Sequence, residues 1–161
     1  MSKKNLEEIY NYLQISDGMA TSGQPTVEQF GAIKQAGYEV VVNLALVDSP
    51  NALANEKEII EAHDMEYIHI PVIWDNPTLE NLHSFFEVMK ANQDKKVFVH
   101  CAMNKRVSVF VYLYRRICLG TSEEEAKLDL NKLWAPSEVW QRLIKQAFDD
   151  AGWRNGTQPT M

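Results

Sequence analysis

One segment restricts the fold of this chain more than any other: residues 97–108, which read VFVHCAMNKRVS. Residues 97–99 are β-branched or aromatic, which is typical of a buried strand, and they run directly into His100 and Cys101. A short polar loop follows, and apolar residues then recur with helical spacing. The segment therefore predicts a buried strand, a tight loop and a helix, with Cys101 at the carboxyl end of the strand.

Strand patterns and helix patterns alternate along the rest of the chain. Strands are predicted at 40–44, 67–72 and 97–100 and an extended segment at 19–22, and helices are predicted at 6–13, 26–36, 55–62, 78–89, 107–119, 122–134 and 136–149. This order predicts one α/β domain over residues 1–161, a three-layer sandwich whose central, mostly parallel sheet of four to five strands is flanked by helices. Only residues 152–161 are expected to form a loose tail.

Composition excludes several classes of function. The net charge of −6 argues against broad binding of nucleic acid or of anionic membranes, and no apolar run reaches membrane-spanning length. The chain has two cysteines, too few for a disulfide framework, so a reducing cytoplasmic location is expected. His63, His69 and His83 lack ligand-like spacing, so neither a metal nor another cofactor is expected. The sequence does not indicate an oligomeric state.

The chemistry predicted for the 97–108 segment centres on Cys101. A cysteine that faces the start of a helix lies near free backbone N–H groups and the positive end of the helix dipole, and both stabilise a thiolate. The same groups bind phosphate-like anions, so the loop amides from Ala102 through Met103, Asn104 and Lys105 to Arg106 are candidate phosphate ligands. The planar fork of Arg106 would grip the anion beside the nucleophile. The alternative is an inert core cysteine, which is the preferred interpretation for Cys118.

Attack of a thiolate on a phosphate ester also requires an acid that protonates the leaving oxygen. Asp75 follows the predicted strand 67–72 and would face the same crevice as Cys101, although an Asp before Asn-Pro also suits a simple turn. Asp48 is a second loop acid, for which a turn-forming role is favoured. Trp74, beside Asp75, is a candidate wall of the pocket or else a packing residue.

Three neighbours of Cys101 have candidate supporting roles, each with a structural alternative. His100 would stabilise the thiolate by a hydrogen bond or a positive charge, or would be held by backbone groups at the strand end. Ser108 would donate a hydrogen bond to the sulfur, or would bond back to its own helical turn. Lys105 would add positive charge to the loop, or would simply be solvated.

These residues resemble the cysteine-dependent phosphatases, in particular the small dual-specificity-like branch found in bacteria. The His-Cys pair followed by an arginine at the next helix is the core of that signature, and residues 21–26 and 37–44 resemble the N-terminal half of the same branch. The resemblance covers about residues 16–119. It implies metal-free hydrolysis of a phosphorylated substrate, a phosphoprotein or a small phosphomonoester, through a phosphocysteine. It also favours Asp75, 26 residues before Cys101, as the general acid.

One departure from the family pattern leaves two rival functions open. Four residues separate Cys101 from Arg106, one fewer than in the family, and none of them is glycine. Asn104 is expected to compensate, because asparagine tolerates left-handed backbone. Sulfurtransferases of the rhodanese type resemble phosphatases but carry a shorter loop, so a cysteine persulfide enzyme is one alternative. The other is a phosphatase-like domain that binds phosphorylated partners with little or no turnover.

Overall fold

The structure of this chain is a computed structural model that describes residues 6–153. Its sheet has the strand order β1-β2-β5-β3-β4. Strands β1 (Leu13–Ser16) and β2 (Met19–Ser22) are antiparallel, whereas β2, β5 (Val97–His100), β3 (Val40–Asn43) and β4 (Glu66–His69) run parallel to one another. The mostly parallel sheet is therefore confirmed.

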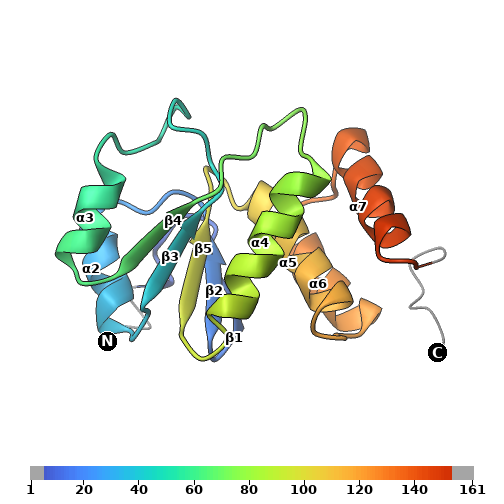
Figure 1. The fold of residues 1–161 in the computed structure, drawn as a ribbon. Helices are drawn as coiled ribbons and strands as arrows, with labels where there is room; N and C mark the ends of the chain where they lie inside the picture. The colour runs from blue at the N-terminus through green and yellow to red at the C-terminus, as the bar shows by residue number, and fades with distance from the viewer. Residues whose placement is uncertain (1–5, 154–161) are drawn as a thin grey trace.

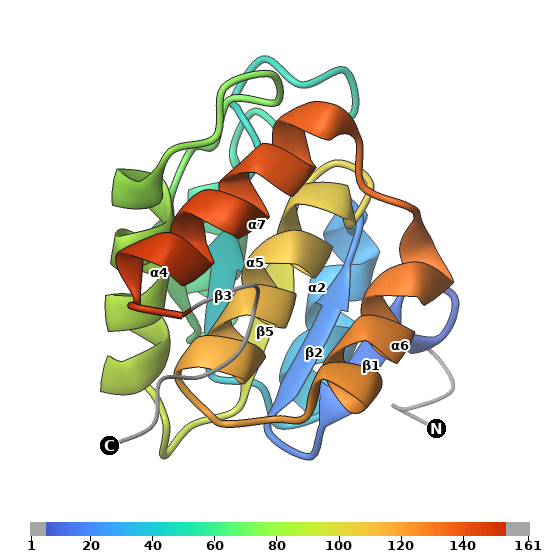
Figure 2. The ribbon, with the colours of Figure 1, turned by 90° about the vertical axis from the view of Figure 1, so that its right-hand side faces the viewer.

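Helices cover both faces of this sheet and complete the predicted three layers (Figure 1). Helices α2 (Val27–Gln35) and α3 (Glu56–Ala62) pack on one face. Helices α4 (Leu79–Ala91), α5 (Lys105–Ile117), α6 (Glu123–Leu133) and α7 (Glu138–Asp150) lie on the other face, as Figure 2 shows. None of the helices in the described part of the chain is long and apolar enough to cross a membrane.

The central strand β5 explains why the 97–108 segment dominates the fold. Residues 97–100 are all buried, because β5 has a parallel neighbour on each side and helices above and below. His100 lies in register with Ser22 of β2 and Asn43 of β3. Helix α5 returns over the sheet between α4, α6 and α7, and its residues 107–115 are all buried. Cys101 thus lies at the carboxyl edge of the sheet's centre.

Two sequence predictions about the ends of the chain need correction. The helix predicted at 6–13 is wrong: Asn11 adopts a left-handed φ of 52°, and Leu13–Ser16 form strand β1 instead. The alternating burial of β1 suits an edge strand that pairs with β2 across a tight turn. Trp153, within the tail predicted at 152–161, is buried and stacks on Phe148. Residues 154–161 lie outside the described part of the chain.

Candidate active site

The segment between β5 and α5 forms a loop whose Ala102 and Met103 carbonyl groups accept hydrogen bonds from residues outside it. The carbonyl oxygen of Ala102 accepts hydrogen bonds from the backbone N–H of Gln24 (3.1 Å) and from Asn51 Nδ2 (3.1 Å). The carbonyl oxygen of Met103 accepts from Asn11 Nδ2 (3.0 Å). In a trans peptide the C=O and the following N–H point in opposite directions, and the described chain has no cis peptide. Fixing the Ala102 carbonyl outward therefore turns the Met103 N–H toward the inner side of the loop.

Asn104 gives the short loop its final turn into the helix. Its φ of 66° and ψ of 11° are left-handed, a backbone conformation that asparagine tolerates. Its buried side chain points out of the loop, where Nδ2 donates to the Asn11 carbonyl (2.9 Å) and to Thr21 Oγ1 (3.0 Å). The backbone of Asn104 therefore turns the loop into the helix, and its side chain bonds the loop to strand β2.

Helix α5 begins next to Cys101 without the usual N-terminal partners. Its N-cap residue, Asn104, makes no side-chain hydrogen bond to the first turn, and that turn contains no acidic residue. It carries Lys105 and Arg106 instead, two cations at the positive end of the helix dipole. Placing like charges there is unfavourable unless an anion is bound nearby, so this helix start is electrostatically suited to an oxyanion.

Arg106 and Cys101 share one pocket of about 390 Å³. The Nε and Nη1 atoms of Arg106 are buried and have no hydrogen-bond partner among the described residues, while the guanidinium lies 5.8 Å from the Trp74 ring centroid. Unpaired buried donors are costly, and an oxyanion in the pocket would satisfy them. The other residues that line the pocket are Ser49, Pro50, Trp74, Ala102, Met103 and Lys105.

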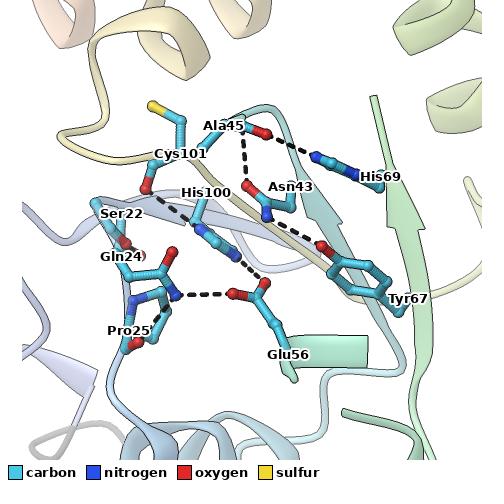
Figure 3. A network of polar contacts seen from close by, with 11 residues as sticks. Ser22, Gln24, Pro25, Asn43, Ala45, Glu56, Tyr67, His69, His100 and Cys101 are labelled. Atoms are coloured by element: carbon cyan, nitrogen blue, oxygen red, sulfur yellow. Dashed lines mark hydrogen bonds and ion pairs between the residues drawn. The ribbon is translucent and has the colours of Figure 1, made fainter. Parts of the chain in front are cut away.

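His100 lies beneath the loop in a buried polar network (Figure 3). Its Nδ1 lies 3.2 Å from the Cys101 carbonyl oxygen, and its Nε2 lies 2.5 Å from Glu56 Oε2. The other Glu56 oxygen accepts from Gln24 Nε2 at 2.8 Å. The Cys101 sulfur points away from this network, so both ring nitrogens of His100 contact groups other than the sulfur.

Ser108 bonds back to its own helical turn, as its structural role requires. Its hydroxyl donates to the Lys105 carbonyl (2.5 Å) and accepts from Trp134 Nε1 (2.9 Å). The Lys105 ammonium in turn lies 5.4 Å from the Trp134 ring centroid. Ser108 therefore braces the first turn of α5 against α6 in this conformation.

Asp75 lies in an exposed turn after β4, next to a residue of the pocket. Trp74 lines the pocket, and its carbonyl oxygen accepts from Trp140 Nε1 (3.0 Å), whereas Asp75 is not among the lining residues. Asp48 is likewise exposed in a turn, beside the lining residues Ser49 and Pro50. The structure thus brings Cys101, Arg106, Lys105 and the loop together and leaves the Asp75 side chain at the rim.

Sequence reasoning missed two buried charged residues, one beneath the loop and one in the last turn of α5. Glu56 opens α3 next to the exposed Glu58, a pattern typical of a solvated first turn, yet Glu56 is buried against His100. Arg115 is also buried, and it pairs with Glu125 and Asp129 of α6. The partners of Glu56 and Arg115 come from other elements, and local patterning gives no signal for such contacts.

Several solved structures share this fold. A phosphatase candidate of the DUF442 group from Shewanella putrefaciens CN-32 is 33% identical, with a TM-score of 0.84, over 92% of this chain and 97% of that one. The core catalytic domain of the PP-IP phosphatase SIW14 from S. cerevisiae is 14% identical with a TM-score of 0.73, over 88% of each chain. PTPMT1, solved with PI(5)P, is 17% identical with a TM-score of 0.74, over 88% of this chain and 96% of that one.

Sequence comparison also relates the chain to a longer protein and to a family. A beta-lactamase hydrolase-like protein from Xylella fastidiosa is 26% identical over 116 residues, which are 70% of this chain. The chain spans only 26% of that relative's length. Residues 9–147 match the family described as DSP-PTPase phosphatase fused to NAD+ kinase. Because that match covers most of the domain and agrees with the fold, the chain belongs to the DSP-PTPase-like phosphatase family.

Proposed function

We propose that this protein hydrolyses phosphomonoesters through a phosphocysteine on Cys101. The observation that carries the proposal is the pocket that Arg106 and Cys101 both line, because the buried Nε and Nη1 atoms of Arg106 have no hydrogen-bond partner within residues 6–153. The amides at the start of α5 and the cation of Lys105 add to the stabilisation of a dianion there. One loop would then hold both the nucleophile and the phosphoryl group that it attacks.

Hydrolysis would proceed in two steps, formation of the phosphocysteine and its hydrolysis by water. Cys101 Sγ attacks phosphorus, the bond to the ester oxygen breaks, and Asp75 donates a proton to the leaving oxygen. The Asp75 carboxylate then takes a proton from water, which attacks phosphorus and releases phosphate and the thiolate. Asp75 lies at the pocket rim in an exposed turn, so the proposal requires its loop to bring the carboxyl over Cys101 when substrate binds.

The pocket favours an aryl or otherwise apolar ester over a polyphosphorylated substrate. Trp74, Pro50 and Met103 supply apolar walls, and only Lys105 and Arg106 among the lining residues are cationic. A substrate such as phosphotyrosine would place its single phosphate on the loop and its ring against Trp74. Inositol phosphates carry several phosphates and would need more cations than this pocket provides.

Hydrolysis of p-nitrophenyl phosphate tests the proposal. The wild-type protein is expected to release nitrophenol and phosphate, and Cys101→Ser is expected to abolish release because an alcohol is a much poorer nucleophile than a thiolate. Cys118→Ser is the matched control and should retain activity, since Cys118 lies at the far end of α5. Activity that survives in Cys101→Ser would contradict the mechanism.

Asp75→Asn tests the general acid separately. In kcat/KM, which reports the first chemical step, its effect should be small for p-nitrophenyl phosphate, whose leaving group needs little protonation, and at least about tenfold larger for phenyl phosphate. Asp48→Asn serves as the matched control from the neighbouring loop. Equal effects of Asp75→Asn on both esters would remove Asp75 from this role.

The short loop favours a second candidate, a sulfurtransferase. Four residues separate Cys101 from Arg106, a spacing that resembles the rhodanese loop. In that reaction the Cys101 thiolate would take the outer sulfur of thiosulfate, release sulfite and pass the sulfur to cyanide as thiocyanate. Thiocyanate production without phosphate release would select this function. High affinity for a phosphopeptide without either product would select a binding domain.

A further inference from the structure

Glu56 is a buried acid to which the proposed reaction gives no task. It is the first residue of α3, it is only 5% exposed, and it is distant from Cys101 in the sequence. An isolated buried carboxylate is costly, and here both oxygens are paired, one with Gln24 Nε2 and one with His100 Nε2. His100 is itself fully buried, with the Phe30 ring 6.0 Å away from its ring centroid. A buried polar network of this kind fixes the orientation of its members.

The partners of His100 determine where its protons lie. The Cys101 carbonyl can only accept a hydrogen bond, so the ring nitrogen facing it, Nδ1, must carry a hydrogen. The second nitrogen, Nε2, then shares one proton with the Glu56 carboxylate. By compensating or supplying this second proton, Glu56 lets Nδ1 keep the hydrogen that the Cys101 carbonyl requires, and it holds the ring in place.

That hydrogen bond has a consequence on the opposite side of the peptide. The Cys101 carbonyl points down into the network, whereas the Cys101 sulfur points away from it (Figure 3). The Cys101–Ala102 peptide is trans, so the Ala102 N–H points opposite to the carbonyl, toward the side on which the sulfur lies. Aiming the carbonyl at His100 is therefore equivalent to aiming the first loop amide at the anion position.

We propose that Glu56 is a positioning residue of this site: through His100 it fixes the Cys101–Ala102 peptide and so directs the Ala102 amide toward the sulfur and its bound oxyanion. The network joins three segments that are distant in sequence, the Gln24 turn, the start of α3 and the end of β5. The proposal deepens the proposed function, because it rests on Cys101 being the reacting thiol. Its test does not require turnover.

The test measures how fast iodoacetamide alkylates Cys101 at about pH 6, with and without inorganic phosphate. Glu56→Gln keeps the size of the side chain but removes its charge, and it is expected to slow alkylation about threefold. The phosphate concentration that half-protects Cys101 should rise by a similar factor, and Glu56→Ala should change both by about tenfold. Glu58→Gln, an exposed acid on the same helix, is the matched control and should behave as wild type.

Loss of stability alone would not reproduce this result. A folded Glu56→Gln protein with a lower melting temperature but wild-type alkylation and phosphate protection would overturn the proposal. Absence of phosphatase activity in the wild type would refute the proposed function, yet the alkylation comparison would still be decisive. If both Glu56 variants fail to fold, proton NMR of the wild type carries the test. The imidazole proton shared with Glu56 should then shift on titration with phosphate, and an unresponsive proton would overturn the proposal.

Discussion

The Nε and Nη1 atoms of Arg106 are buried and have no hydrogen-bond partner among the described residues. A bound anion would supply these partners, so Arg106 is the residue at which we expect a ligand. Arg106→Lys keeps the charge but loses the planar fork of donors. Hydrogen bonds to charged groups contribute about 1.5–3 kcal/mol, so inorganic phosphate should inhibit about ten- to a hundredfold less strongly. Arg142→Lys, exposed on α7, is the matched control. Equal phosphate inhibition of Arg106→Lys and wild type would show that Arg106 does not bind the anion.

At the scale of secondary-structure elements, the segment that follows β2 packs so closely against the Cys101 loop that Gly23 has no room for a side chain. A Cβ there would lie 2.6 Å from Tyr10 Cδ2 and 2.8 Å from the Ala102 carbonyl oxygen. Gly23→Ala is expected to lower the free energy of unfolding by about 1–3 kcal/mol and to weaken phosphate binding, because the loop must shift. Gly18→Ala is the control, since its Cβ would meet only the Lys95 carbonyl oxygen at 3.9 Å. Urea unfolding and phosphate inhibition measure both effects, and a Gly23→Ala protein that matches Gly18→Ala would contradict this account of the crossing.

At the scale of the whole molecule, the protein is expected to lose stability at alkaline pH, because a tyrosine is buried in the core under α2. Burial, with a smaller contribution from Tyr12, raises the pKa of Tyr38 to about 12. The unfolded chain releases this proton near about pH 10, so the contribution of Tyr38 to stability is complete below about pH 10 and is lost as pH rises toward about 12. In Tyr38→Phe the unfolding free energy should fall less steeply over that range. Tyr10→Phe, whose ring is half exposed, is the control. An unchanged slope in Tyr38→Phe would refute the prediction.

The sequence predicted those parts of the molecule that depend on local pattern. Strands β2 and β5 have the predicted bounds, and the left-handed backbone of Asn104 follows from the lack of glycine in its loop. The pairing of Glu56 with His100 could not be predicted, because the two residues are 44 positions apart and meet only once α3 packs on the sheet. The helix predicted at 6–13 failed because sheet pairing with β2 outweighed a weak helical pattern.

The central claim, that Cys101 carries the phosphoryl group, is tested most directly by rapid acid quench of the protein during turnover of p-nitrophenyl phosphate, followed by mass spectrometry of the peptide containing Cys101. The account predicts a phosphoryl group on Cys101 itself, and more of it in Asp75→Asn, because activation of water in the second step is slowed. Continued release of phosphate with Cys101 unmodified at every quench time, or a persulfide at Cys101 in its place, would contradict the account.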